Sequence, residues 1–410
     1  MSRNYKNLYT STNDSIALEQ AFYLKLETTK GTLIAPQSTD FLYTLGGGSI
    51  TFNQPFESSP HRSGRHHLDI IKKKKELSWS FSTYMNIDET LGSPVSTEID
   101  TPVRTLYKSL LGGESLVAGA TYSPTVAPDT TFTLFEVGDK WCRQARGCYV
   151  DGGKINLPGS GEATTEWSGI GVESVLIGIG KSTISNNLGN TITLQVGEGA
   201  RFRVGGMVML VHADGVTRSG DTVAGTARLI TAVVGDVVTL GGAVLADADG
   251  STTEIYLCYY EPAAKTAINN PVTGLVGSVN IVGFGSQCIR SLSYDIKNDH
   301  EKVDYCYGHD SLDAPYFVPA NRLSVNVSME LNLNDRVIAF FNGVQNFTST
   351  NLTAVLGTAT GRRLQVLTPK IRFPVPAFAV PETGSIPVTF AGMAYETVLD
   401  AADEVNVAFI

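Results

Sequence analysis

Three histidines stand close together in a basic stretch of the chain, and clustered histidines can bind metal ions. They are His61, His66 and His67, and four consecutive lysines follow them. A zinc site needs a closed set of ligands, and no cysteine or carboxylate stands at helical or hairpin ligand spacing from these histidines. His66 and His67 are adjacent, so on a strand they would face opposite sides. We therefore expect no metal and no cofactor here.

The same basic stretch is a candidate contact surface. It could contact phosphate, but it stands alone in an acidic chain and has no interleaved aromatic residues. We expect a loop between two strands that becomes ordered on the acidic surface of a neighbouring subunit, with lysines that blunt a sheet edge until then. A solvated loop without a partner is the alternative. The candidate contacts between subunits or between rings are Arg62, Arg65, His66, Lys72, Lys73, Lys74 and Lys75.

A second stretch, residues 291–320, carries the opposite charge. Opposite charges on equivalent loops favour contact between unlike loops and disfavour contact between like ones. We therefore expect this acidic loop to bind the basic one in a neighbouring subunit. The candidate complementary residues are Asp295, Asp299, Glu301, Asp304 and Asp310.

Residue types that form catalytic sites are present but not in catalytic patterns. The glycine run Gly46–Gly48 lacks the Gly-Lys-Ser/Thr ending of a phosphate loop. Ser160, between two glycines, has no nearby histidine in the sequence to activate it. We therefore expect no enzyme activity.

Composition restricts the class of protein further. The chain has 410 residues, a net charge of −9, 17% charged residues and 41 glycines, which favours sheets and turns and argues against tight wrapping of nucleic acid. No apolar run is long enough to cross a bilayer, so we expect no membrane partner. Cys142 and Cys148 could meet across a tight hairpin, but the five cysteines are an odd number, and we expect reduced thiols.

The elements that carry these residues occur twice. Leu77–Ser82 matches Leu323–Ser328, and Trp167–Gly169 matches Phe390–Gly392. At similar spacings Gly48–Phe52 matches Gly277–Ile281, and Glu173–Leu176 matches Glu396–Leu399. A self-similar chain of this kind predicts two copies of one β-rich domain.

Each copy should contain one short helix. In the first copy Thr101 and Pro102 suit a helix start and Gly112 a helix end, and in the second copy Asn334 or Asp335 suits the start and Gly343 the end. Each copy should finish in a long hairpin, and in the first copy the return strand, Glu254–Tyr260, is delayed by a separate β-rich segment. A hairpin tip tolerates such an insertion because its ends stay close. The expected organisation is an N-terminal arm (1–18), a first domain (19–176 with 254–262), an inserted β-domain (177–253) and a second domain (263–410).

The segments Gly31–Pro36, Arg62–Arg65 and Lys73–Met85 together resemble the tail tube proteins of long-tailed bacteriophages. The resemblance implies an all-β fold, with two tandem sandwich or barrel domains, one short helix in each, and an outer inserted domain. It implies trimeric, pseudo-hexameric rings that stack into a tube in the virion tail, after synthesis in the host cytoplasm. The implied partners are other copies of the chain, the tail terminator, tape measure and distal tail proteins, and double-stranded DNA that passes through without specific binding.

Three other functions are compatible with a β-rich chain. A receptor- or glycan-binding protein would use the insert as its binding module, although Phe202 is one of few aromatic residues there. A capsid or decoration protein would also be β-rich and self-associating. A hydrolase would need an active site assembled from residues far apart in the sequence.

Overall fold

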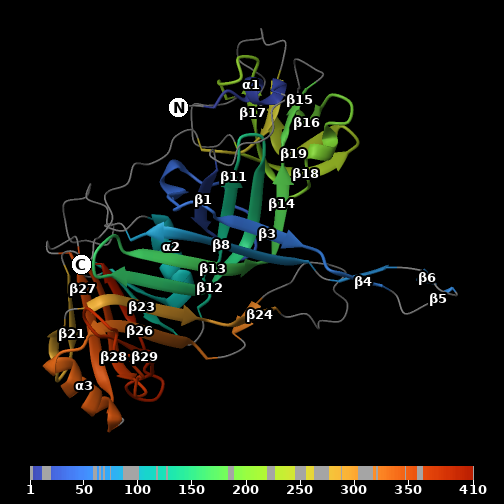
Figure 1. Cartoon of the computed structure of the whole chain (residues 1–410). Helices are drawn as coiled ribbons and strands as arrows, with labels where there is room; N and C mark the ends of the chain where they lie inside the picture. The colour runs from blue at the N-terminus through green and yellow to red at the C-terminus, as the bar shows by residue number, and fades with distance from the viewer. Residues whose placement is uncertain are drawn as a thin grey trace.

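The computed structural model contains mostly strands, with three α-helices among the described residues (Figure 1). The all-β class predicted from the sequence is confirmed, and the pairings of the described strands do not close into a barrel. The structure describes residues 3–11, 20–58, 62–63, 66–67, 70–73, 75–85, 101–116, 119–125, 128–182, 189–218, 227–244, 255–262, 277–287, 289–302, 317–319, 322–346, 348–357 and 363–409.

The first copy consists of two sheets that share one long strand, β12 (Cys142–Pro158). The first half of β12 pairs with β11 and β14, and its second half pairs with β13. The other strands of this copy are β1 (Ala21–Leu26), β2 (Phe41–Leu42), β3 (Ser49–Asn53), β8 (Glu76–Tyr84), β9 (Gly112–Ser115), β10 (Ala120–Pro124), β11 (Phe132–Val137), β13 (Thr164–Gly171) and β14 (Glu173–Ile177).

The second copy repeats these pairings strand by strand. Its shared strand, β28, pairs with β27, β29 and β30, as β12 pairs with β11, β13 and β14. Its strands are β21 (Gly277–Ile281), β22 (Gly285–Gln287), β23 (Ile289–Lys297), β26 (Ser324–Asn332), β27 (Thr350–Leu356), β28 (Leu364–Arg372), β29 (Pro387–Ala394) and β30 (Asn406–Phe409).

One helix covers the inner side of the sheets in each copy, as expected from the sequence. These helices are α2 (Thr101–Leu111) and α3 (Asp335–Gln345). The side chain of Asn334 caps α3 by accepting a hydrogen bond from the amide of Val337 at 3.0 Å. At the end of α2, Gly112 has a φ of 89°, a left-handed conformation that glycine adopts without strain.

The two copies are joined edge to edge. Strand β12 pairs with β23 over seven residue pairs, from Gly152 opposite Lys297 to Pro158 opposite Ser291, and β10 pairs with β30. The strands β3, β8, β13, β12, β23, β26 and β29 therefore form one continuous layer across both copies (Figure 1). Apolar side chains from both copies form one core cluster behind this layer.

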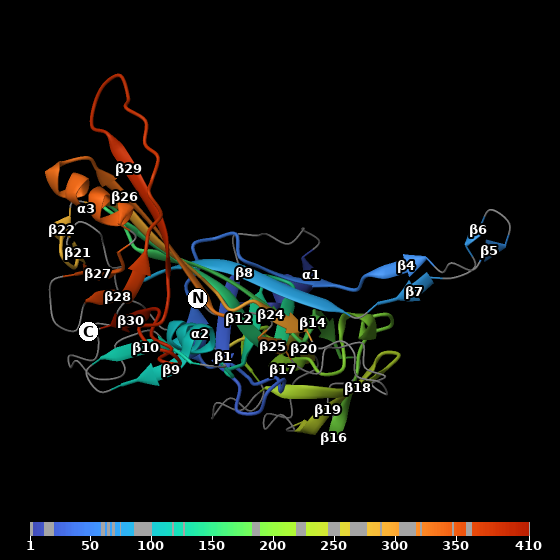
Figure 2. The same ribbon diagram turned by 90° about the horizontal axis from the view of Figure 1, so that it is seen from below.

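Each copy has a further hairpin between two neighbouring strands of this layer, β3 and β8 in the first copy and β23 and β26 in the second. In the first copy it projects far from the body (Figure 2) and consists of β4 (Phe56–Ser58), β5 (Arg62–Ser63), β6 (His66–His67) and β7 (Ile70–Lys72). We call residues 54–75 the basic arm. The second copy has β24 (His300–Lys302) paired with β25 (Phe317–Pro319) at the same place in its topology.

The inserted module forms a separate six-stranded sheet, and its core cluster continues into the first copy and the N-terminal arm through residues such as Tyr23, Phe135 and Tyr5. Its strands are β15 (Ile179–Lys181), β16 (Gly189–Thr193), β17 (Met207–His212), β18 (Arg228–Val234), β19 (Val237–Val244) and β20 (Ile255–Tyr259). The prediction that residues 254–262 return to the first domain is wrong, because β20 pairs with β15 and β17 inside the insert. The return strand is β14, which follows β13 directly and so closes a much shorter loop.

The strand pairings also correct three of the sequence matches. Ile50 lies opposite Trp79 as Tyr294 lies opposite Val327, so β3 corresponds to β23 and not to Gly277–Ile281. By the same pairings, Trp79 corresponds to Val327, two residues from the match made by sequence. A strand with a period of two looks alike when shifted by two residues, and only its partners fix the register. In the second copy β30, not Glu396–Leu399, corresponds to β14.

The described part of the N-terminal arm lies against the insert. It contains a short helix, α1 (Tyr5–Thr10), which the sequence analysis did not predict. The Tyr5 side chain is buried, and its amide donates to the carbonyl of Gly215 at 2.7 Å. The arm therefore packs within its own subunit.

Candidate functional site

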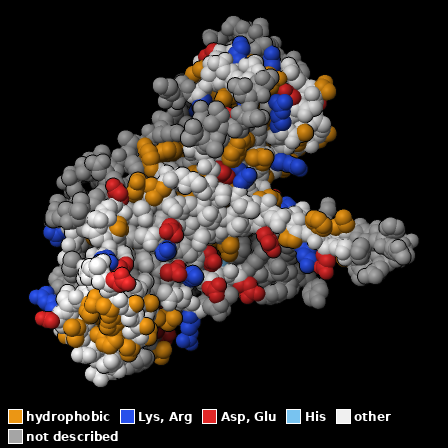
Figure 3. Space-filling model, viewed as in Figure 1, with side chains coloured by type: hydrophobic (Ala, Val, Ile, Leu, Met, Phe, Trp, Pro, Cys, Tyr) orange, Lys and Arg blue, Asp and Glu red, His pale blue; other side chains and the backbone are white. Residues whose placement is uncertain are grey.

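The continuous layer exposes one polar face. Along β8 the side chains of Trp79 and Phe81 point into the core, whereas Ser78 and Ser80 are exposed. The same alternation places Asn326 of β26 on the exposed side. The alternation therefore places small hydroxyl and amide side chains on a surface that spans both copies. Figure 3 shows this face as mostly white, the colour of uncharged polar side chains and backbone, with scattered charged side chains.

Charges on this face are largely balanced in pairs. Lys154 lies 4.0 Å from Glu166, Arg290 lies 3.2 Å from Glu330, and Lys297 lies 3.5 Å from Asp295. Exposed pairs of this kind contribute little to stability. Because each of these three cations lies near a carboxylate, it attracts phosphate only weakly.

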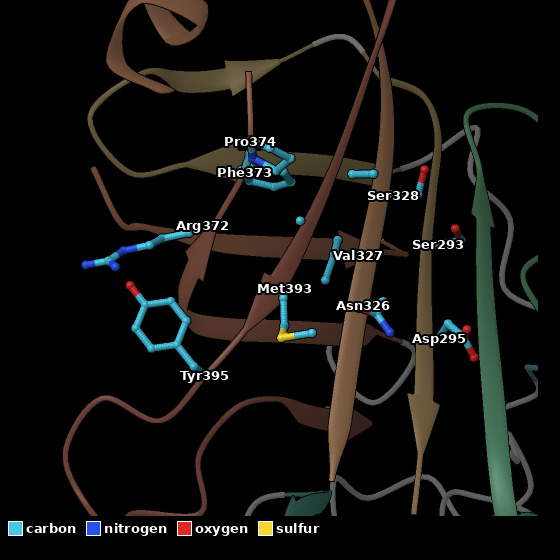
Figure 4. A pocket seen from close by; sticks show the side chains of 12 residues that line it. Ser293, Asp295, Asn326, Val327, Ser328, Arg372, Phe373, Pro374, Met393 and Tyr395 are labelled. Atoms are coloured by element: carbon cyan, nitrogen blue, oxygen red, sulfur yellow. The ribbon is translucent and has the colours of Figure 1, made fainter. Parts of the chain in front are cut away.

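A groove of about 730 Å³ lies over the second copy's part of the face (Figure 4). Asp295 and Asn326 line one side of the groove, and Arg372, Met393 and Tyr395 line the other. The Arg372 guanidinium lies 5.2 Å from the centre of the Tyr395 ring, a cation–π contact. These residues do not form a nucleophile with a base. Within the described residues, no group of three or more His, Cys, Asp or Glu side chains could hold a metal.

The basic arm residues do not meet the acidic set within the chain. Lys73 lies 2.9 Å from Glu57 on the paired strand of its own hairpin, and Lys75 lies 3.7 Å from Glu173 of β14. Both carboxylates belong to the first copy. Arg62, His66 and Lys72 lie on the arm strands, with side chains outside the described residues, and Arg65 and Lys74 lie outside them altogether.

The acidic set is spread over two elements of the second copy. Asp295 lies on the polar face beside Lys297, and Glu301 lies on the short strand β24. Asp299 has a φ of 53°, a left-handed conformation at the turn between β23 and β24. Asp304 and Asp310 lie outside the described residues. Pairing of these residues with the basic arm of another subunit stays a prediction.

A buried polar cluster at the junction of the copies was not found from the sequence. Asn298, just after β23, donates from Nδ2 to the carbonyl oxygens of Leu110 at 2.7 Å and Val150 at 3.2 Å. Asp151 of β12 accepts from the amide of His300 at 2.7 Å and lies 3.2 Å from its Nδ1. Burial alone would raise the pKa of Asp151, but the hydrogen bonds from His300 lower it below its usual value.

A second cluster, also missed, fixes the N-terminal arm. The Glu261 carboxylate is buried, and it lies 3.1 Å from Nε of Arg3. It also accepts hydrogen bonds from the hydroxyls of Tyr5 at 3.1 Å and Tyr23 at 3.3 Å. Burial raises the pKa of Tyr5 well above its usual value, so this hydroxyl stays a donor. Single polar residues far apart in the sequence gave no signal for this cluster.

The described cysteines are buried thiols. Cys142, Cys148 and Cys258 are free, so Cys142 and Cys148 are not joined. Burial raises the pKa of each of these thiols well above its usual value. A thiol that stays protonated is a poor nucleophile and a poor metal ligand.

Two comparisons with known proteins found no relative: no family model matches the chain, and no curated protein matches its sequence. Among the described helices, none has the length and apolar character needed to cross a membrane.

Proposed function

We propose that this chain is a structural virion protein whose copies close into rings and stack into the hollow tail tube of a long-tailed bacteriophage. In this proposal three chains form one ring, and their six domains give pseudo-sixfold symmetry. The tube conducts DNA into the host and has no enzyme activity. The tail terminator, tape measure and distal tail proteins are its other expected partners.

The observation that carries the proposal is the ladder between β12 and β23. It joins two copies of one domain into a single sheet, with seven residue pairs at the seam. The same edge-to-edge pairing, repeated between chains, would continue the sheet, and closure into a ring would remove its open edges. Stacking such rings head to tail uses a contact that does not close, so the rings propagate as a tube.

The chemistry of the exposed face supports a lining for a DNA channel. Its side chains are short and mostly uncharged, as at Ser78, Ser80 and Asn326. Lys154 and Lys297 are neutralised by neighbouring carboxylates, and the chain as a whole is acidic. DNA would therefore pass without being held by phosphate contacts.

The insert and the basic arm then have distinct places in the assembly. The insert lies away from the polar face, at the end of β11 and β14 (Figure 1), which suits the outside of a tube. The basic arm projects beyond the layer (Figure 2) and exposes Phe56, Ile70 and Ile71, at 70%, 57% and 51%. Apolar side chains on a projecting hairpin suit contact with the next ring.

Electron microscopy of the purified protein tests the proposal. We expect hollow rings or tubes that show threefold symmetry after rotational averaging, with three outer protrusions per ring. Monomers at all concentrations, or solid closed particles, would contradict it. Such results would favour the glycan-binding and capsid alternatives, respectively.

A further inference from the structure

The sheet of one chain has two open ends, and the junction inside the chain shows how such ends can join. At that junction Lys154 lies opposite Asp295, and Ile155 lies opposite Tyr294. Ile155 and Leu157 of β12 are 0% and 4% exposed there. Within the part of the chain that the structure describes, the counterparts of these two strands at the far ends of the sheet have no such partner.

The counterpart of the joining half of β12 is the segment after β28. Arg372 lies opposite Met393 as Tyr149 lies opposite Ile170, so Arg372 corresponds to Tyr149. Counting on along the sequence from this pair, Phe378 and Val380 correspond to Ile155 and Leu157 of the first copy, and Pro381 corresponds to Pro158. The pattern is the same but the burial is not, because Phe378 is 42% and Val380 is 70% exposed.

This segment, Pro374–Pro381, is apolar, uncharged and largely open to solvent. It follows the buried Phe373 and leads into a loop that extends away from the body before β29 (Figure 2). Exposed apolar stretches on folded proteins usually mark contact surfaces. Its prolines lack amide donors, so it pairs poorly with arbitrary strands.

The counterpart of β23 is β3, at the other end of the sheet. Its pairing with β8 places Ile50 at the position of Tyr294, and Thr51 at the position of Asp295. Among the described strands β3 pairs only with β8, whereas β23 is paired on both sides. Just before β3, Gly46 and Gly47 have open space where side chains would lie.

We propose that the segment Pro374–Pro381 of one chain lies along β3 of a second copy of this chain and forms the seam between subunits. This inference rests on the proposed function, because it names the residues by which the ring closes. By equivalence with the internal junction, Ala377 lies opposite Thr51, and Phe378 lies opposite Ile50. The apolar segment becomes buried as Ile155 and Leu157 are buried within the chain.

In the free subunit a polar cap occupies part of the β3 edge. The carboxylate of Glu136 accepts from the amide of Ile50 at 3.3 Å, and the Arg143 guanidinium donates to the carbonyl of Ile50. Gln20 donates to the carbonyl of Gly48 at 2.9 Å and to Glu136 at 2.6 Å. The proposed seam displaces this cap at Ile50, so the cap protects the edge from other strands until the apolar segment arrives.

The equivalent positions in the second copy show no such cap. Ala354 and Val366 stand there in place of Glu136 and Arg143, by the pairing of β27 with β28. The edge they adjoin, β23, is already covered by β12. The cap is therefore present at the edge that is open in the single chain.

A charge placed on the apolar segment tests the seam. We expect Val380→Asp to lower the fraction of protein in rings by about tenfold or more, because the charge would be buried at each seam. Far-ultraviolet circular dichroism should be unchanged, since Val380 is exposed in the subunit. The matched control is Val196→Asp on the insert, where the valine is 96% exposed, and its ring fraction should equal that of wild type.

Cross-linking tests the register. The double variant Ala377→Cys with Thr51→Cys should form disulfide-linked dimers and trimers on oxidation, whereas each single variant should not. If wild type forms rings, but the double variant does not cross-link and Val380→Asp leaves the rings intact, the seam is wrong and the proposed function stands. If wild type forms no rings at any concentration, both are overturned.

Discussion

Removal of the Asn298 side chain should weaken the junction between the two copies. Asn298 belongs to the second copy and is 3% exposed. Its acceptors, the carbonyl oxygens of Leu110 and Val150, both belong to the first copy and lie 2.7 Å and 3.2 Å from Nδ2. Asn298→Ala therefore deletes two hydrogen bonds that cross the junction.

The size of the effect follows from burial. An exposed hydrogen bond contributes little because water replaces it, but a buried carbonyl left without a donor costs about 1–3 kcal/mol. With two such carbonyls, we expect Asn298→Ala to lower the free energy of unfolding by about 2–4 kcal/mol. The matched control is Asn326→Ala, since Asn326 lies on the exposed face, and it should change this free energy by less than about 0.5 kcal/mol.

Urea unfolding followed by tryptophan fluorescence measures the difference. The three tryptophans, Trp79, Trp141 and Trp167, all belong to the first copy, so fluorescence reports whether that copy is weakened by a residue of the second. Circular dichroism followed in the same samples reports both copies. An Asn298→Ala unfolding free energy within about 0.5 kcal/mol of wild type would refute the reasoning.

Three further predictions concern other buried contacts. Arg3→Ala leaves the buried carboxylate of Glu261 without its cation, which should cost about 3 kcal/mol and speed limited proteolysis of the insert. The pKa of Asp151 is lower in the folded chain than in the unfolded chain, where it is about 4. The ionised carboxylate therefore raises the free energy of unfolding above about pH 4, and this contribution is lost as pH falls through the folded pKa. Asp151→Asn should show less acid destabilisation in urea titrations. Gly169→Ala places a methyl group against the Trp79 ring and should destabilise the fold by about 3 kcal/mol, measured by thermal unfolding.

Two of these predictions have a control variant, and the third has a result that would contradict it. Lys6→Ala changes another cation of the same arm, whose Nζ donates to the carbonyl of Ala213 at 3.1 Å, and proteolysis as fast as in Arg3→Ala would contradict the role of Glu261. Equal acid sensitivity of wild type and Asp151→Asn would show that another group dominates the acid response. Gly241→Ala meets its neighbours at 3.5 Å or more, so a loss as large as that of Gly169→Ala would exclude the steric explanation.

Much of the local structure followed from the sequence alone. Alternation along Glu76–Tyr84 predicted a half-buried strand, and the stripe of α2 with its terminal glycine predicted a helix. These signals lie within single elements, where side-chain spacing and turn residues decide the backbone. The start of the insert after β14 was also visible, because the second copy has no matching segment.

Strand partners could not be read in the same way. Ile255–Tyr259 has the composition of a buried strand, which would suit either the insert or the first domain, and only its pairing with β15 and β17 decides between them. The basic arm was visible as a charged run, but the partner of Lys73 is a residue of its own hairpin. Long-range pairing depends on which surfaces remain open once the rest of the chain has packed.

Side-chain periodicity acts over a few residues, and it was enough to predict an all-β protein with one helix in each of two similar halves. The pairing of strands between those halves depends on contacts between residues far apart in the sequence, which only the folded chain shows. The tertiary structure joined β12 to β23, and it left Phe378 and Val380 exposed where Ile155 and Leu157 are buried. The physical reason is that burial of a strand depends on its neighbours, and the same alternating pattern is buried or exposed according to whether a partner strand lies beside it.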